Sequence, residues 1–478
     1  MDKELQNYQI AGFSLQKRYS DLGTDNIDQL KRHLLDSMGS LLHATQKPSI
    51  AKLARQLSFL EKSGPCKVPL LPGLSFDRAA QLYTALIRYP DFMDNYMGKE
   101  ATCHPSDNIG VLLAASQLRK TSGKEFLTAM AISYQVECRL VEEIPVMMEG
   151  MDHTLFLAYS MVAGMAQLLG LTKEQTAHAL GISGCSISPL VTSRASYTYE
   201  WKGFASSLEA LNSMNIALLA REGMTGPIAL FEGPKGFKEI FDMNLEYDWS
   251  KESFDLVRKC VLKRYNAEVH SQSTIEALLE LRDQHSIDPR EIEKIDITTF
   301  LTAYHIIGSG AYGDRKKVET KEQADHSLFY LVAVAFLDGD IYPEQFEPAR
   351  IKRKDVQDLL QKVFVKTGFP LHKPLKLAGV LDPYTEAYPD KLRARVEITL
   401  KNGKTFTCEK EDCHGFFTRP FDWDYTIEKF KRLTRDTVNE KRRNEIIDTI
   451  QRLDKEEDMS KLIGLLCIES KSYEPVTV

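Results

Sequence analysis

The chain has 478 residues, of which 43% are hydrophobic and 27% are charged, and its formal net charge at pH 7 is -6. This length favours two domains, and the composition is that of an ordinary globular protein, so long disordered stretches are not expected. Lysine and arginine are spread along the chain without forming a basic stripe, and the sequence therefore predicts no nucleic acid partner.

The sequence carries no targeting or membrane signal that we recognise, and we expect a cytoplasmic protein. The first residues, MDKELQNYQIAGF, lack the charged and then apolar pattern of a secretory signal. The most apolar run, 155–171, contains Ser160, two glycines and Gln167, which favours a buried helix over a membrane span. The eight cysteines show no CxxC pair and no histidine at zinc-finger spacing, so we expect reduced thiols.

Helical periodicity dominates the chain from its N-terminus to about residue 250. The predicted helices cover 26–43, 76–89, 108–118, 124–141 and 174–182. Turn signals stand where helices should end, at 64–73, at Gly223 and at 225–227. This part of the chain is predicted to be all-α.

The pattern changes after about residue 262. Isoleucine and threonine alternate within 291–304, which predicts a strand, and 393–410 predicts a β-hairpin. Asn402 and Gly403 lie between the two alternating runs of this hairpin and suit a type I′ turn.

Further helices are predicted between these strands and after them. They cover 273–284, 325–338 and, in a charged stretch, about 424–453. Ser273 followed by Glu276 is expected to form a capping box.

The predicted fold is therefore mainly α. Both chain ends, 1–262 and 412–478, form a large all-helical domain, and a smaller α+β domain, 263–411, is inserted between them. A cleft between two domains is a common place for a small-molecule site.

Two histidines stand at the starts of predicted apolar helices. His104 comes before a helix that Ser106 or Asp107 can cap, and His153 follows Asp152, which can cap the next apolar helix. The N-terminal end of a helix favours anions. Taken alone, either histidine is more often a capping or packing residue than a proton-transfer group.

Basic residues lie at two further points. Lys202 precedes a helix rich in alanine and serine, where a lone lysine is usually a solvated surface charge. Lys263, Arg264 and His270 lie at the predicted domain junction, where they suit either a ligand or an interdomain ion pair.

Five separated segments resemble, in the same order, motifs of the MmgE/PrpD family. They are HPSDNIGVLLAA, GMDHTL, WKGFA followed by ALLAREGMTGP, NAEVHSQSTIEA and ADHSLFYLVAVAFLDG. The resemblance spans roughly 30–435. It implies that the inserted domain is a lid, that the protein is a homodimer, and that an active site between the domains uses no metal or organic cofactor.

The resemblance also carries site residues over to this chain. Those predicted to carry the chemistry are Asp91, His104, His153, Lys202 and Lys263. A lid tyrosine is expected, and the spacing leaves it open between Tyr304 and Tyr312. The predicted substrate-binding residues are Asn95, Tyr304, Tyr312, Lys202, Lys263, Arg264 and His270.

The reaction expected from the resemblance is the dehydration of a small tricarboxylate similar to 2-methylcitrate. Loss of a proton beside a carboxylate builds up negative charge that cations must stabilise, here Lys202 and Lys263. His104 and His153 are expected to transfer the protons, with Asp91 orienting one of them. The same pocket suits a cis-aconitate decarboxylase or an isomerase or epimerase, and a non-catalytic dimeric family member is the other alternative.

The sequence departs from the family pattern at two points. Met93 and Asn95 replace an acid or amide and a threonine within the run that begins at Asp91, so the substrate need not be the family's commonest one. The segment 414–430 is bulkier and more aromatic than the turn that it replaces, which favours packing, with a substrate that has a larger arm as the alternative.

Overall fold

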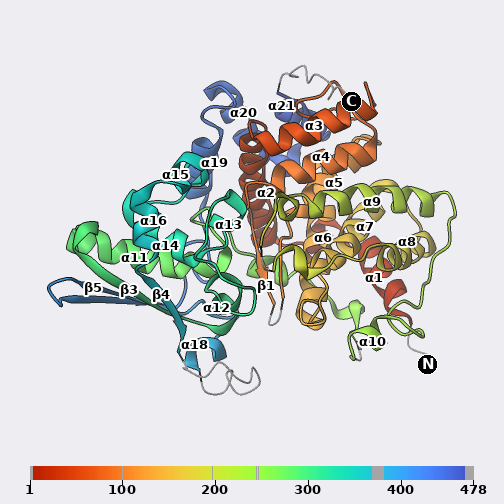
Figure 1. Ribbon diagram of the computed structural model, residues 1–478. Coiled ribbons are helices and arrows are strands. Elements are labelled where there is room, and N and C mark those ends of the chain that lie inside the picture. The colour runs from red at the N-terminus through yellow and green to blue at the C-terminus, as the bar shows by residue number, and fades with distance from the viewer. Residues whose placement is uncertain are drawn as a thin grey trace. The chain divides into compact units, whose positions relative to one another are not determined.

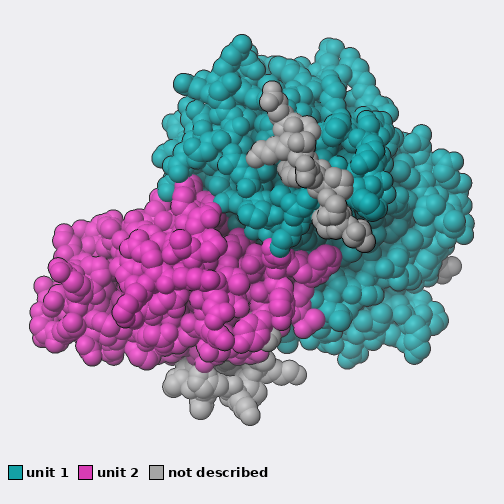
Figure 2. All heavy atoms as spheres, turned by 45° about the horizontal axis from the view of Figure 1, so that its top comes forward, with its two compact units in different colours: residues 1–191, 203–262, 421–478 teal, residues 192–202, 263–420 magenta. Residues whose placement is uncertain are grey.

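The computed structural model describes residues 4–98, 101–195, 197–243, 245, 247–368 and 382–468. It has two compact units, shown in different colours in Figure 2. The first unit comprises Met1–Val191, Gly203–Leu262 and Phe421–Val478, and the second comprises Thr192–Lys202 and Lys263–Pro420. The predicted domain ranges and the lid role of the inserted part stay predictions.

The first unit is built mainly of helices (Figure 1). They are α1 (Gln6–Gln16), α2 (Thr24–Ala44), α3 (Pro48–Leu60), α4 (Phe76–Arg88), α5 (Asp107–Ala115), α6 (Gly123–Glu143), α7 (Thr154–Leu169), α8 (Lys173–Ser186), α9 (Ala205–Arg221), α10 (Phe237–Ile240), α19 (Trp423–Thr434), α20 (Glu440–Gln451) and α21 (Ser460–Leu466). The predicted helices of this region are confirmed, with 424–453 divided into two.

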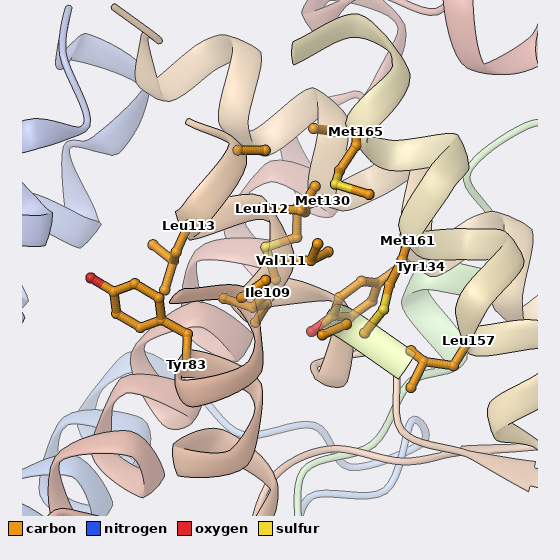
Figure 3. Close-up of a cluster of buried hydrophobic side chains, with 14 of the residues drawn as sticks. Tyr83, Ile109, Val111, Leu112, Leu113, Met130, Tyr134, Leu157, Met161 and Met165 are labelled. Atoms are coloured by element: carbon orange, nitrogen blue, oxygen red, sulfur yellow. The ribbon is translucent and has the colours of Figure 1, made fainter. Parts of the chain in front are cut away.

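The core of this unit lies where α4, α5, α6 and α7 meet. All nine residues of α5 are buried, and Gln167 alone of the sixteen residues of α7 is not. Helices that are apolar on every side have to be enclosed by others. Figure 3 shows part of this core, to which the four helices contribute, in order, Tyr83, Leu112, Met130 and Met161. Each such buried side chain contributes about 1.5–3 kcal/mol through the hydrophobic effect.

The apolar run that ends at 171 is therefore a core helix, as predicted. No helix within the described residues is long and apolar enough to cross a membrane. All eight cysteines have free thiols, and none forms a disulfide.

The first unit is not entirely helical, which corrects the all-helical prediction. Strand β1 (Tyr96–Met97) pairs with β2 (Thr102–Cys103) in an antiparallel ribbon. The ribbon starts next to Asn95, whose backbone pairs with that of Val261, and it ends next to His104. Because Tyr96 pairs with Cys103, the two predicted site residues Asn95 and His104 lie at the same end of the ribbon.

The second unit contains a four-stranded sheet and short helices. The sheet order is β4-β3-β5-β6, with β3 (Ile292–Thr299) parallel to β4 (Val363–Thr367) and antiparallel to β5 (Ala394–Leu400), which pairs with β6 (Thr405–Lys410). The helices are α11 (Gln272–His285), α12 (Leu301–Ile307), α13 (Lys321–Ala324), α14 (Leu328–Asp338), α15 (Pro348–Ile351), α16 (Lys354–Leu360) and α18 (Pro383–Glu386). The predicted α+β character of this region is confirmed.

The strand predicted over 291–304 is too long. It ends at Thr299, and α12 begins at Leu301, whose N–H donates to Thr385 Oγ1 at 2.9 Å. The predicted helix 325–338 begins only at Leu328, because Ser327 caps it by accepting the N–H of Tyr330.

The type I′ turn and the capping box are wrong predictions. Gly403 has a φ of +84°, whereas Asn402 does not have a positive φ, and the N–H of Gly403 donates to Leu400 O. This is a three-residue loop with glycine in the left-handed position. Ser273 Oγ donates to Leu392 O, and the Glu276 carboxylate accepts hydrogen bonds from His414 and Arg419, so neither side chain caps α11.

Candidate active site

His104 is held by the backbone of the loop before it. Its Nδ1 donates to the carbonyl oxygen of Asp94 at 3.0 Å, and the side chain is 7% exposed. Because a carbonyl only accepts, the proton of a neutral His104 lies on Nδ1. Nε2 is then the nitrogen that can take up a proton.

His153 lies beside His104. The two ring centroids are 5.4 Å apart, with the rings edge to face. His153 immediately precedes α7, and its Nε2 is 3.6 Å from Asp152 Oδ1, which also accepts the N–H of Thr154. The predicted cap by Asp152 is thus present, and the starts of α5 and α7 bring two buried imidazoles together.

Asp91 is paired with an arginine that the sequence did not single out. Its Oδ1 is 2.9 Å from Arg88 Nη1, and Arg88 Nε is 3.6 Å from Asp107 Oδ2. Asp91 has a φ of +56°, a conformation that costs a non-glycine residue about 1 kcal/mol or more. Arg88 therefore connects this strained residue to the first turn of α5.

Asp94 organises the same loop, and the sequence analysis missed it. Its Oδ1 accepts the N–H of Ser106 at 2.9 Å, and its Oδ2 lies 2.7 Å from both Tyr134 OH and His33 Nδ1. The prediction that Ser106 or Asp107 caps α5 is wrong, because neither side chain caps this helix. The Asp94 carboxylate accepts the backbone N–H of Ser106 at this end instead. Burial would raise the pKa of Asp94, but these hydrogen bonds and His33 hold it below its ordinary value.

Replacing Asp94 by asparagine should lower the free energy of unfolding by about 3 kcal/mol at pH 7, because hydrogen bonds to a buried charge are lost. The depressed pKa of Asp94 means that its contribution is present above the unfolded-state value of about 3.9 and fades as the pH falls through the folded-state value. Urea denaturation measures the free energy of unfolding of the wild type and of Asp94→Asn between pH 8 and pH 3.5. The difference between the two free energies should stay constant down to about pH 4 and become smaller only below it. A difference already lost by about pH 6 would point to another group.

Asn95 lies between this loop and the two-stranded ribbon. Its side chain is 2% exposed, and within the described residues its Oδ1 has no hydrogen-bond partner. An amide oxygen of this kind suits a ligand hydroxyl, so the predicted substrate-binding role of Asn95 stays open. Met93, the other departure from the family pattern, is fully buried in the hydrophobic core.

The second unit carries its own cluster of buried charges around Asp325. Lys202 Nζ is 3.1 Å from Asp325 Oδ1 and 2.9 Å from His326 Nδ1, and Lys321 Nζ is 2.9 Å from Asp325 Oδ2. Lys202 is only 3% exposed, so it is not the solvated surface lysine that usually occurs. Burial would raise the pKa of Asp325, but the charges of the two lysines outweigh it and hold that pKa far below its ordinary value.

His270 is fixed by an acid and by a tyrosine. Its Nδ1 is 2.7 Å from Glu268 Oε1, and its Nε2 is 3.1 Å from Tyr388 OH. Burial opposes ionisation of Glu268, yet the nearby imidazole holds the pKa of this acid below its ordinary value. Tyr388, which also stacks on Phe300 at 4.8 Å, is a tyrosine that the sequence analysis did not consider.

The remaining predicted residues of this unit differ in how far they are buried. Lys263 is 1% exposed, whereas the Arg264 side chain is 27% exposed and lies 3.2 Å from Asp340. Tyr304 on α12 and Tyr312 beyond it are both partly exposed. The structure therefore brings Asp91, Asn95, His104 and His153 into one unit, and the lysines, Arg264, His270 and the two tyrosines into the other.

The structure thus combines a mainly helical frame with buried histidines and acids in both units, and with buried lysines among the predicted site residues of the second. The N-terminal domain model of the MmgE/PrpD family matches residues 8–250, and the C-terminal domain model matches 265–369 and 376–455. The chain therefore belongs to the MmgE/PrpD family, and the resemblance seen in its motifs is confirmed.

Relatives of the chain include three named dehydratases. 2-Methylcitrate dehydratase of Escherichia coli (strain K12) is 28% identical over 354 residues, which are 69% of this chain and 71% of the relative. Alkylcitrate dehydratase phiI of Fungal sp. (strain ATCC 74256) is 28% identical over 342 residues, 64% of each chain. The probable 2-methylcitrate dehydratase of Saccharomyces cerevisiae (strain ATCC 204508 / S288c) is 24% identical over 422 residues, 76% of this chain and 80% of the relative.

Proposed function

We propose that this protein is a lyase that removes water from a small tricarboxylate similar to 2-methylcitrate. The observation that carries the proposal is the pair of buried imidazoles, His104 and His153, whose ring centroids are 5.4 Å apart at the starts of two helices. The names of the relatives, which act on 2-methylcitrate or an alkylcitrate, support the substrate class.

The histidines are suited to the two proton transfers of a dehydration. His104 Nε2 takes the proton from the carbon beside a carboxylate, since Nδ1 is already bound to the Asp94 carbonyl. The electron pair of that C–H bond forms the C=C bond, and the C–O bond to the hydroxyl breaks. His153, in its protonated form near Asp152, gives the leaving hydroxide its proton, so that water departs.

The cations of the second unit are suited to hold the carboxylates. We assign this role to Lys202 and Lys263, with His270 and either Tyr304 or Tyr312 as further hydrogen-bond donors. Negative charge that builds up on a carboxylate in the transition state is stabilised most by cations already fixed in place. Lys202 meets this condition, because its ammonium group is held between Asp325 and His326.

The experiment is incubation of the purified protein with 2-methylcitrate, citrate and cis-aconitate. Absorbance of a conjugated acid without release of CO₂ supports the dehydratase, and CO₂ from cis-aconitate supports the decarboxylase instead. Isomerisation without either signal would indicate the third reaction. Sedimentation of the same sample tests the homodimer that we expect from the family resemblance.

A further inference from the structure

Lys429 on α19 is a buried lysine that the proposed reaction leaves unused. It is 1% exposed, and its Nζ is 2.7 Å from Asp36 Oδ1 on α2. The same Nζ donates a hydrogen bond of 2.8 Å to the carbonyl oxygen of Phe92 and lies 3.8 Å from the centre of the Phe92 ring. One ammonium group therefore joins α19 both to α2 and to the loop 91–95, which carries predicted site residues.

A glycine allows α2 and α19 to pack closely beside this contact. Gly39 lies about one turn after Asp36 on α2, and a Cβ at this position would lie 3.3 Å from the side chains of both Phe430 and Leu433 on α19. A larger residue at position 39 would have to displace these side chains from a dense core. The small glycine therefore favours the close packing that brings Lys429 to Asp36.

Helix α2 also holds the same loop through His33. Its Nδ1 is 2.7 Å from Asp94 Oδ2, so the loop is held at Phe92 by Lys429 and at Asp94 by His33. Asp94 in turn positions His104, because its carbonyl oxygen accepts the Nδ1–H of that imidazole at 3.0 Å. A contact at Phe92 is thus two residues away from the group that fixes a predicted proton-transfer residue.

Stability alone gives little reason to bury these charges. Burial raises the pKa of Asp36, and the charges of Lys429 and His33 oppose this rise. Desolvation offsets much of the attraction within a buried ion pair, so two apolar side chains of similar volume are often as stable. The buried carbonyl of Phe92 is different, because a backbone acceptor away from water is stabilised by a donor, and Lys429 is a donor to it.

We propose that Lys429 is a positioning residue, which holds the loop 91–95 and thereby places the Asp94 carbonyl where it fixes His104. Without this hydrogen bond the loop shifts, and His104 Nε2 moves relative to the carbon that loses its proton. A displacement of about 1 Å at a reacting group can lower a rate by about 100-fold. The inference rests on the proposed function for the part that His104 plays in the reaction.

The first test measures hydrogen exchange of the loop in the full-length protein without substrate. Two backbone N–H groups report on it. That of Asn95 donates to Val261 O at 3.0 Å, and that of Ser106 donates to Asp94 Oδ1 at 2.9 Å. In Lys429→Met both should exchange at least about tenfold faster than in the wild type. Exchange that stays at the wild-type rate at either position overturns the proposal.

Lys31 on α2 provides a matched control. Its Nζ donates to Gln451 O at 3.0 Å and pairs with Asp454, so it too joins a carboxylate and a backbone carbonyl, but away from the loop. Lys31→Met should lower the melting temperature, as Lys429→Met does, and leave loop exchange and kcat within about twofold of the wild type. Equally fast loop exchange in both variants would show a general loss of stability and contradict the proposal.

The second test measures kcat and KM for the dehydration. Lys429→Met should lower kcat by about 10- to 100-fold and keep KM within about threefold, since the assigned carboxylate-binding residues Lys202 and Lys263 are unchanged. A wild-type kcat in folded Lys429→Met would contradict the positioning role and leave the proposed function in place.

The double variant Lys429→Met with Asp36→Leu separates positioning from folding. It replaces both charges by apolar side chains, so its melting temperature should return toward that of the wild type. Its kcat should stay low, because the Phe92 carbonyl has still lost the lysine donor, and a kcat that recovers together with the melting temperature would overturn the proposal. If the wild type turns over no tricarboxylate, the proposed function fails, while loop exchange still decides whether Lys429 holds the loop.

Discussion

Replacing His104 by alanine is expected to lower kcat for tricarboxylate dehydration by about 10²- to 10⁴-fold, the usual contribution of a general base. The structure offers a sharper variant, because asparagine can donate its side-chain N–H where His104 Nδ1 donates to the Asp94 carbonyl. His104→Asn therefore keeps the hydrogen bond and removes Nε2. Its kcat should fall as far as that of His104→Ala, while its melting temperature stays closer to that of the wild type.

The matched control for His104 is His178 on α8 in the same unit. Its Nδ1 lies 2.9 Å from the Gly226 carbonyl, and its Nε2 is 3.2 Å from Glu174. His178→Asn should leave kcat within about twofold of the wild type, since neither contact serves proton transfer. Steady-state kinetics of His104→Ala, His104→Asn and His178→Asn test whether His104 transfers a proton. Substantial activity in His104→Asn would contradict that role.

Replacing Lys202 by methionine should have two large effects. Turnover should be lost, because a fixed cation for a substrate carboxylate disappears. The free energy of unfolding should also fall by about 3 kcal/mol, because Asp325, which is 1% exposed, keeps its charge while one of its two paired lysines is removed. If Lys202 served turnover alone, the melting temperature would stay almost unchanged. A lower melting temperature therefore shows that Lys202 also stabilises the buried charge of Asp325.

The double variant Lys202→Met with Asp325→Asn separates these two effects. Removing both charges should restore much of the stability, because a buried ion pair is often no more stable than a neutral replacement. The double variant should remain inactive. Thermal melts and kcat/KM are measured together, and an active double variant would show that Lys202 only neutralises Asp325.

The sequence predicted the helical frame well, because the apolar periodicity of helices such as α4 and α6 is a local property. The two histidines at helix starts were also visible, since each stands next to an apolar run. Asp94 was not recognised, because its partners His33, Ser106 and Tyr134 come from three separate parts of the chain. No local pattern reports contacts of that kind.

The same limit applies in the second unit. Tyr388 is 118 residues from His270, whose Nε2 it approaches, so spacing along the chain gave no reason to consider it beside Tyr304 and Tyr312.

For the aromatic segment 414–430, in contrast, the local sequence was informative. Its Phe416 is fully buried and lies against Phe417 at 4.3 Å, which supports the packing interpretation of that segment.

The most direct measurement compares wild type and His104→Asn side by side with 2-methylcitrate as the single substrate. The wild type should form one equivalent of unsaturated acid for each substrate molecule consumed, without CO₂, and His104→Asn should form it at least about 100-fold more slowly. If the folded wild-type protein leaves 2-methylcitrate intact, or if the variant matches it, dehydration by a buried pair of histidines is contradicted.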